Sequence, residues 1–322
     1  MNLKYRILYI FVFWMYCGAM FAQERIEPIP FGDFDQWVVR KIKESAIIGK
    51  EVKTLYAVGP TETITENKPY EPKGGSPWGC SNVMAKVSGI TKASSSVYPE
   101  DRANGQCARL ETLIESCSAM GFVNIKVLVG GCLYLGKFLE PAKNSSETWG
   151  QIVCGIPFHK KPSSLHFDYK VQLSGEPNRI KLSGFSKRSE VEGKDMPVVN
   201  LYLQKRWEDK HGNIYAKRIG TLVVQMDKNT DWVNNASFPI LYGDITKRSD
   251  YESYMGLLKG EAQRFSKNSK GKNVPIQEIG WGSESDEVTH IILEFCSSYG
   301  GSYIGSPGTK FWVDNVQLGY DK

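Results

Sequence analysis

Apolar and polar residues alternate with a period of two along much of the chain, for example in segment 166–173. Every second residue of that segment is apolar, which gives one face Phe167, Tyr169, Val171 and Leu173. Successive side chains of a β-strand point to opposite faces of a sheet, so the pattern predicts a strand with one buried face. Segments 199–206 and 289–296 alternate in the same way, with the inward sets Val199, Leu201 and Leu203, and Ile291, Leu293 and Phe295.

Further strands are predicted at 124–129, 220–226, 237–242 and 310–318. Helical spacing of apolar residues is found only at 109–119 and 251–259, and the first of these also fits a strand because Ala108, Leu110 and Thr112 alternate. Many strands that end in turn residues, with almost no helix, predict an all-β protein. The expected fold is an antiparallel β-sandwich, either immunoglobulin-like or of the jelly-roll type.

The amino terminus has the pattern of an export signal. Lys4 and Arg6 precede the apolar stretch 7–16, and small residues follow as far as Ala22. This pattern predicts a signal peptide over residues 1–22, and the apolar run is too short for a membrane-spanning helix. We therefore expect an exported protein, in the periplasm or at the cell surface, without a transmembrane segment. Neither repeats nor a linker divide the rest, so we expect one domain over residues 23–322.

The charge is nearly balanced, with 40 Lys and Arg residues against 35 Asp and Glu residues and a net charge of +5 over 322 residues. Nucleic-acid-binding domains carry a concentrated basic surface, so a nucleic-acid partner is not expected. The chain is 41% hydrophobic, which is typical of a folded protein and excludes a disordered polymer.

Six cysteines follow the predicted signal peptide: Cys80, Cys107, Cys117, Cys132, Cys154 and Cys296. An even number in an exported protein permits disulfides. Six is nevertheless far too few for a disulfide scaffold of this length, and several lie in apolar strand-like runs, so buried free thiols are the simpler interpretation. No cysteine and histidine spacing is typical of a zinc site.

Common enzyme motifs are missing from the sequence. There is no Gly-x-Ser-x-Gly nucleophile elbow and no His-Glu-x-x-His zinc motif. Glycoside hydrolysis needs only two carboxyl groups across a cleft, which a sequence does not display. Glu111, Asp168 and Glu294 are the candidates, and the alternative for each is a solvated strand face or a structural ion pair.

Aromatic and polar residues together indicate a carbohydrate ligand. Aromatic rings stack on the C–H faces of sugars, while charged and amide groups bind the hydroxyls. Trp78 and Trp281 lie in turn-rich segments, where binding residues concentrate. The polar faces of the predicted strands, which lie opposite the core, add further candidates. The predicted carbohydrate-binding residues are Trp78, Asp168, Lys170, Gln204, Arg206, Trp281 and Glu294.

Two segments near the ends of the chain are predicted to be neighbouring strands, Phe31–Trp37 and Phe311–Leu318. A Phe-x-x-Trp opening strand with a closing Val-Asp-Asn-Val strand resembles many carbohydrate-binding modules. In those modules an acidic residue of each strand holds a structural calcium ion, which by resemblance nominates Asp35 and Asp314. Two carboxylates make an incomplete calcium site, so a salt bridge or a turn cap is the alternative role for them.

A fuller resemblance is to the bacterial family called the putative carbohydrate metabolism domain, over about residues 30–322. It implies exported proteins of Gram-negative gut bacteria with a β-jelly-roll domain and a glycan pocket, but it does not imply a particular reaction. Some members carry an immunoglobulin-like domain before the jelly roll, for which the few residues between Ala22 and Phe31 leave no room. The segments that carry the resemblance, in order, are 76–82 (SPWGCSN), 107–112 (CARLET), 155–162 (GIPFHKKP), 167–170 (FDYK) and 308–316 (GTKFWVDNV).

Taken together, these features predict an exported jelly-roll protein that binds an oligosaccharide or polysaccharide without cleaving it, alongside other glycan-handling surface proteins. One alternative is a glycoside hydrolase or polysaccharide lyase that uses two of the three candidate carboxylates, with Lys170 or Arg206 holding a charged sugar. The other is a structural or adhesive surface protein without a small ligand, for which a large exposed apolar patch would speak.

Overall fold

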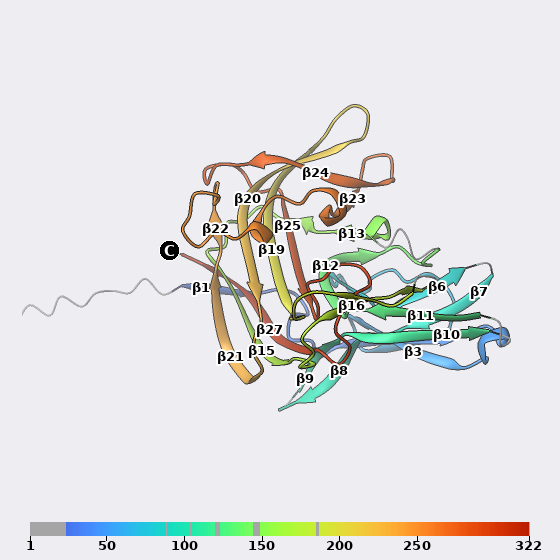
Figure 1. The fold of residues 1–322 in the computed structure, drawn as a ribbon. Coiled ribbons are helices and arrows are strands. Elements are labelled where there is room, and N and C mark those ends of the chain that lie inside the picture. The colour runs from blue at the N-terminus through green and yellow to red at the C-terminus, as the bar shows by residue number, and fades with distance from the viewer. Residues whose placement is uncertain are drawn as a thin grey trace, which may run out of the picture.

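The computed structural model describes residues 24–87, 89–103, 105–119, 123–143, 149–184 and 187–321, and the predicted signal peptide, residues 1–22, lies outside them. Figure 1 shows a sandwich of two large sheets beside a group of small sheets, which we call the sandwich region and the small-sheet region. Among the described residues, no helix has both the length and the apolar character of a membrane span. The helical elements are the 3₁₀ turns η1 (Ala46–Ile48), η2 (Trp149–Gln151), η3 (Ser253–Met255) and η4 (Gly260–Ala262).

The first large sheet has the last strand of the chain near its centre, and its strands pair antiparallel. Bulges at Asn235 and Asn315, two residues with positive φ, interrupt its register beside Asp168. In spatial order the sheet contains β21 (Thr230–Pro239), β15 (Ser164–Gln172), β27 (Lys310–Tyr320), β9 (Gly105–Glu111) and β8 (Val97–Arg102), and β1 (Arg25–Pro28) also pairs with β27.

The second large sheet is built around the long hairpin of β19 (Val198–Glu208) and β20 (Ile214–Gln225). Asp209 closes this hairpin, since its Oδ1 accepts hydrogen bonds from the backbone N–H groups of His211 and Asn213, both at 2.9 Å. The sheet also contains β13 (Ile152–Cys154), β12 (Cys132–Phe138), β25 (His290–Cys296), β24 (Asn273–Trp281), β23 (Phe265–Lys267), β14 (Ile156–Pro157), β22 (Leu241–Tyr242) and β5 (Trp78–Cys80).

Apolar side chains of the two large sheets meet in one continuous core. Phe167 of β15 and Phe295 of β25 contact each other edge to face, with ring centroids 5.2 Å apart. Leu201 of β19 and Val313 of β27 are fully buried in the same cluster. Each such side chain contributes roughly 1.5–3 kcal/mol on burial, so this core is the main source of stability. The predicted all-β sandwich of the jelly-roll type is confirmed, and its large sheets are antiparallel except where β24 pairs parallel with β20.

The small-sheet region adds only a few side chains to that core, among them Trp37 of β2 and Val58 of β3, and otherwise has small clusters of its own. Ile42 and Leu55 pack with Met84 in one small cluster, and Leu128 packs with Ile180 in another. Its sheets are β3 (Val52–Val58), β2 (Trp37–Lys43) and β4 (Glu62–Ile64); β6 (Val83–Val87) and β7 (Ile90–Ser94); β10 (Leu113–Ala119), β11 (Val123–Val129) and β17 (Ser183–Gly184); and β18 (Ser189–Val191), β16 (Arg179–Lys181) and β26 (Ile304–Gly305).

The segment between β22 and β23, residues 243–264, crosses the outward face of the second sheet. Its Leu258 packs with Tyr202 and Ile276, and the Leu258 backbone N–H donates to Glu278 Oε2 at 2.7 Å. The polar side of β19 is therefore covered by protein at this point. The predicted helix at 251–259 is wrong, because the segment makes only 3₁₀ turns separated by extended residues.

The other strand predictions have mixed outcomes. The strands at 166–173, 199–206, 289–296, 124–129 and 310–318 are confirmed within one or two residues. The helical interpretation of 109–119 is wrong, since these residues belong to β9 and β10. Segment 31–36 forms turns with positive φ at Phe31 and Phe34, and β1 takes the expected place beside β27. Trp37 begins β2, in a different sheet.

Candidate functional site

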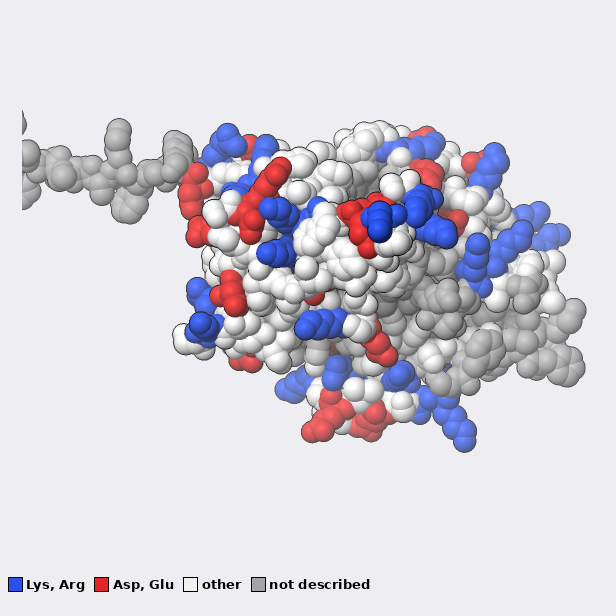
Figure 2. All heavy atoms as spheres, turned by 90° about the horizontal axis from the view of Figure 1, so that it is seen from above, with Lys and Arg blue, Asp and Glu red and all other residues white. Residues whose placement is uncertain are grey.

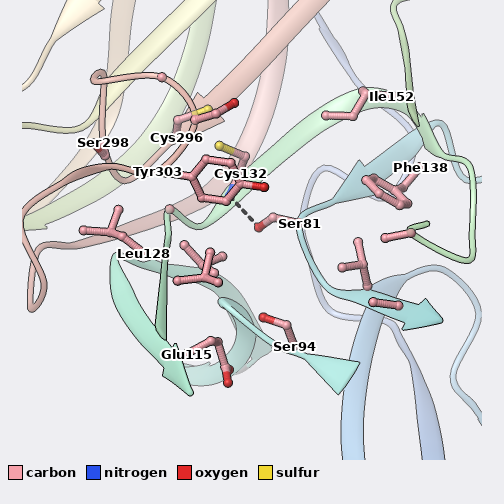
Figure 3. A pocket seen from close by; sticks show the side chains of 18 of the residues that line it. Ser81, Ser94, Glu115, Leu128, Cys132, Phe138, Ile152, Cys296, Ser298 and Tyr303 are labelled. Carbon is pink, nitrogen blue, oxygen red and sulfur yellow. Dashed lines mark hydrogen bonds between the residues drawn. The ribbon is translucent and has the colours of Figure 1, made fainter. Parts of the chain in front are cut away.

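A cleft with a volume of about 380 Å³ lies where the small-sheet region meets the sandwich region (Figure 3). Its floor is the outward face of β12, β19 and β25, and its walls come from the β6–β7 and β10–β11 hairpins. The loop 298–303 lies at its rim. Small-molecule sites occupy roughly 300–1,000 Å³ and combine apolar walls with a few polar groups, and the cleft fits that description.

One end of the floor is polar, and its centre is Glu294 of β25. The Glu294 carboxylate accepts hydrogen bonds from Arg264 Nε at 2.6 Å and Nη2 at 2.8 Å, and from Asn200 Nδ2 at 3.3 Å. Burial alone would lower the pKa of Arg264, but the adjacent carboxylate raises it above its ordinary value. Arg264 therefore stays charged and holds Glu294 in a bidentate pair.

Tyr134 of β12 places a hydroxyl in the cleft lining that has no hydrogen-bond partner in the protein. The residue is 4% exposed, and burial raises the pKa of its hydroxyl well above the ordinary value. The ring is fixed by the backbone of β5, since a Cβ at Gly79 would lie 2.7 Å from Tyr134 Cε2. Buried polar groups normally have partners, so a ligand group is the natural complement of this protonated hydroxyl.

The far end of the cleft is lined by Ser94 of β7 and Glu115 of β10, opposite Cys132 and Cys296 (Figure 3). The Ser94 hydroxyl is also buried without a partner in the protein. Burial raises the pKa of the Glu115 carboxyl, an effect that nearby Lys92 partly offsets. Tyr134, Ser94 and Glu115, whose carboxyl has a raised pKa, thus line the cleft from both regions of the molecule.

Tyr303 and Tyr299 add aromatic rings to the rim of the cleft. Tyr303 has a φ of 65°, a conformation that costs a non-glycine residue energy and is retained here by the surrounding loop. Tyr299 is held by Arg179, whose Cζ lies 4.6 Å from the ring centroid. Tyrosine rings with fixed orientation are suited to stacking on a sugar.

Trp78, predicted as a binding residue, lies in the sandwich core instead of at a cleft rim. It is 1% exposed, it packs edge to face on Phe34, and its Nε1 donates to the backbone oxygen of Pro30 at 2.9 Å. The prediction relied on the turns around Trp78. These turns flank β5, a short strand at the edge of the core, and Trp78 belongs to that strand. Its ring has no free face for a sugar.

Gln204 and Arg206 face away from the core as predicted, but Gln204 is bound to Glu278, which also accepts from the Leu258 N–H of segment 243–264. Glu278 accepts from Gln204 Nε2 at 2.5 Å and from Arg218 Nε at 2.6 Å, which makes a buried network. Arg206 Nε donates to Gln204 Oε1 at 2.7 Å, and burial lowers the pKa of Arg206 to about 10. These side chains bind one another and are not among the cleft lining.

Trp281, at the end of β24, is half-buried beside this network, with Arg218 Cζ 5.8 Å from its ring centroid. It is not among the residues that line the cleft. Of the seven predicted carbohydrate-binding residues, Glu294 is the one that the cleft lining includes.

Asp168 and Asp314 meet on the outward face of the first sheet. Both carboxylates contact Arg102 Nη1, at 2.9 Å for Asp168, and the Arg102 Cζ lies 3.8 Å from the Trp232 ring centroid. Burial raises the pKa of Asp314 to about 6 although Arg102 opposes the shift. Burial also acts on Asp168, but hydrogen bonds, first from the Asn235 N–H, lower its pKa.

The two predicted calcium ligands have separate partners. Asp35 Oδ1 accepts from the Gln106 backbone N–H at 2.7 Å, while Asp314 contacts Arg102, which supplies a positive charge. Among the described residues, no three His, Cys, Asp or Glu side chains gather as a metal site would require. These contacts match the alternative of a turn contact and a salt bridge.

The candidate carboxylates of the hydrolase alternative do not share one cavity. Glu294 faces the cleft, whereas Asp168 and Glu111 face outward from the other sheet. Asp168 pairs with Asp314 and Glu111 with Lys310 on opposite sides of β27, so they are roughly 13 Å apart along the strand direction alone, at about 3.3 Å per residue, with β27 between them. Glu111 forms a salt bridge with Arg109.

Lys170, on the same face as Asp168, covers an aromatic ring, since its Nζ lies 5.2 Å from the Trp312 ring centroid. Trp312 is buried and donates from Nε1 to Glu100 at 2.8 Å. Figure 2 shows Lys and Arg interspersed with Asp and Glu over the described part of another face. The described part of that face carries no broad field of one sign.

Sequence reasoning missed several residues of the cleft. Asn200 lies on the same polar strand face as Gln204, which was predicted. Only the position along the strand, which the pattern does not evaluate, places Asn200 and not Gln204 in the cleft. Glu115 lies in the segment whose period fitted either helix or strand. Tyr134 lies in a short apolar run, Cys132–Leu135, where no pattern distinguishes it from a core residue.

Comparisons with known proteins found similar solved structures and one family model. The fold is similar to that of a putative glycoside hydrolase from Bacteroides thetaiotaomicron, with a TM-score of 0.43, 15% sequence identity, and coverage of 85% of this chain and 76% of that chain. For a putative glycoside hydrolase from Bacteroides vulgatus, the TM-score is 0.40 and the identity 12%, with 92% of this chain and 96% of that chain covered. No curated protein matches the sequence. A family model described as "Putative carbohydrate metabolism domain" matches residues 55–319, so the chain belongs to this family.

Proposed function

We propose that the protein is an exported carbohydrate-binding protein, in the periplasm or at the cell surface, which holds a glycan in the cleft without cleaving it. Membership of a carbohydrate-metabolism family supports a glycan-related role. The amino-terminal pattern of a basic start, an apolar stretch and small residues supports export.

The single observation that carries the proposal is the Tyr134 hydroxyl, a protonated donor that is buried in the cleft lining without a partner in the protein. A sugar hydroxyl is both donor and acceptor, so hydroxyls at different positions of a glycan can pair with Tyr134 at the floor and with Ser94 at the far end. Tyr299 and Tyr303 at the rim can pack on the C–H face of the same ring. The apolar side chains of β6 and β11 exclude water from these contacts.

The state of the carboxyl groups supports binding without cleavage. Ordinary glycoside hydrolysis needs an acid and a second carboxylate at a set separation. Both oxygens of Glu294 accept hydrogen bonds from Arg264, which leaves Glu294 poorly placed to attack a sugar or a water. In this arrangement the ion pair holds Asn200 and the floor of the cleft in position.

Titration calorimetry with glycans that bind on an array provides the test. Tyr134→Phe removes only the hydroxyl, so affinity should fall about tenfold, the effect of about one lost hydrogen bond in a desolvated site. Tyr70→Phe is the matched control, because the Tyr70 hydroxyl is also buried without a partner but is not part of the cleft lining. Equal affinities of both variants and the wild type, or no binding of any glycan, would contradict the proposal.

One observation favours a second candidate function, glycoside hydrolysis. Glu115 has a carboxyl pKa raised by burial, as a general acid requires, and lines the same cleft as the ion-paired Glu294. Incubation of each bound glycan with the protein, followed by product analysis, separates the two functions. Turnover that is lost in Glu115→Gln while binding persists would establish hydrolysis in place of simple binding.

A further inference from the structure

Two cysteines from distant parts of the chain face each other across neighbouring strands at the cleft. Cys132 of β12 is the register partner of Cys296 of β25. Directly opposite residues of an antiparallel pair project from the same face of a sheet. The flanking Leu133 and Phe295 point into the sandwich core, so both thiols point to the cleft, whose lining includes them.

Backbone hydrogen bonds show which kind of cross-strand pair this is. The Cys132 N–H donates to Ser81 Oγ at 2.8 Å, and the Cys132 carbonyl accepts from the Ser81 N–H at 2.9 Å. Both backbone groups of Cys132 are therefore directed to Ser81, on the side away from Cys296. The pair belongs to the non-hydrogen-bonded class, in which Cα atoms are about 4.5 Å apart and side chains are closest.

That geometry satisfies the requirements of a disulfide. Disulfides span Cα separations of roughly 4.4–6.8 Å, and the two thiols need no movement of the backbone to meet. Figure 3 shows the sulfur atoms of Cys132 and Cys296 beside each other at one end of the cleft. The Cys132 thiol raises the pKa of Cys296 through a side-chain hydrogen bond, and burial adds to the shift.

We propose that Cys132 and Cys296 form a disulfide across the floor of the cleft when the protein meets a disulfide oxidant such as oxidised glutathione. This proposal is independent of glycan binding. Cys132 is half-buried and lines the cleft, so its thiolate attacks one sulfur of the oxidant and releases the other as a thiol. Cys296, 8% exposed, then attacks the mixed disulfide.

The two steps balance in atoms and electrons. The first forms a sulfur–sulfur bond between Cys132 and one glutathione and breaks the bond within the oxidant. The second forms the Cys132–Cys296 bond and releases the remaining glutathione. The protein thiols lose two electrons and two protons, and the oxidant is reduced to two thiols. The product joins β12 covalently to β25 beside Glu294.

The test is intact mass, thiol titration in denaturant and peptide mapping after equilibration with oxidised glutathione. The wild type should lose two thiols and the mass of two hydrogen atoms, with Cys132 and Cys296 in one linked peptide. Cys117→Ser is the matched control, because Cys117 also lines the cleft but has Ile125 as its strand partner. This variant should still lose two thiols.

Two further variants make the mechanism visible. Cys296→Ser should keep a glutathione adduct on Cys132, because the thiol that resolves it is missing, and Cys132→Ser should form neither the link nor the adduct at that position. Oxidation should raise the denaturation midpoint of the wild type and not that of either variant. A persistent adduct on wild-type Cys132, a link to another cysteine, or unchanged thiols at equilibrium would overturn the proposal.

Discussion

The sandwich region and the small-sheet region bury apolar side chains on very different scales. Side chains of both large sheets merge into one cluster around Phe167, Leu201 and Phe295. The small sheets add Trp37 and Val58 to that cluster, and their other buried apolar side chains form two small clusters, around Leu55 and Leu128. Stability rises with the apolar area that is buried together, so the sandwich is the rigid scaffold and the small sheets open more easily.

The cleft lies at the boundary between these two regions, and this position has a functional meaning. Its floor, with Glu294 and Tyr134, belongs to the sandwich and is fixed by the core beneath it. Its walls, with Ser94 and Glu115, belong to hairpins that rest on little buried area. A rigid floor can hold polar groups in place while the walls adjust to a ligand.

The largest expected effect comes from breaking one buried ion pair in each region. Glu278→Gln leaves Arg218 without its charged partner, and Glu140→Gln does the same to Arg40 in the small-sheet region. Removal of one member of a buried pair costs about 3–5 kcal/mol of unfolding free energy. Glu278→Gln should lower the global stability in denaturant, whereas Glu140→Gln should mainly speed amide exchange in β2 and β6.

An exposed ion pair provides the control for that comparison. Asp250→Asn removes the partner of Arg248 at the surface, where solvent screens the charges, so no measurable change is expected. If Glu140→Gln unfolds β19 and β25 together with β2 and β6, the two regions form one cooperative unit and the comparison fails.

The next effect compares the loss of unfolding free energy when the same Leu→Ala substitution is made in the large core and in a small cluster. Leu201→Ala in the sandwich core should cost about 3–5 kcal/mol, and Leu128→Ala in its small cluster about 2–3 kcal/mol, because a loosely packed site collapses more readily onto a cavity. Urea denaturation of both variants gives the two values. A larger loss for Leu128→Ala would show that the small-sheet region is packed as tightly as the sandwich.

The smallest of these effects concerns pH and the carboxyl of Asp314. Its pKa is raised by burial to about 6 from an ordinary 3.8, so the neutral form is favoured in the folded protein. The stabilisation is complete below pH 3.8 and is lost as the pH rises through 6. Between pH 4 and 7 the wild type should lose about 1–3 kcal/mol more than Asp314→Asn.

Glu115 provides the matching group in the small-sheet region, because burial raises its pKa in the same direction. Thermal melts of wild type, Asp314→Asn and Glu115→Gln across this pH range separate the two contributions. A difference between wild type and Asp314→Asn that stays constant with pH would mean that Arg102 keeps Asp314 ionised throughout.

The sequence by itself determined the fold class and the inward face of the main strands. The alternation around Phe167, Leu201 and Leu293 depends only on local strand geometry, which makes every second side chain point to the same face. The motifs that resemble the family could also be recognised from the sequence alone, and the match to the family model confirms the membership that they indicated.

Only the tertiary structure decided which outward faces remain open. Gln204 and Asn200 have the same pattern along β19, yet the segment 243–264 covers Gln204 while Asn200 lines the cleft. Likewise, the place of Tyr134 and Ser94 in the lining of one cleft, and the pairing of Cys132 with Cys296, depend on sheet order and register between distant strands. The alternation along one strand does not say which residues of another strand lie opposite it. Long-range packing alone therefore decides which of these side chains come together.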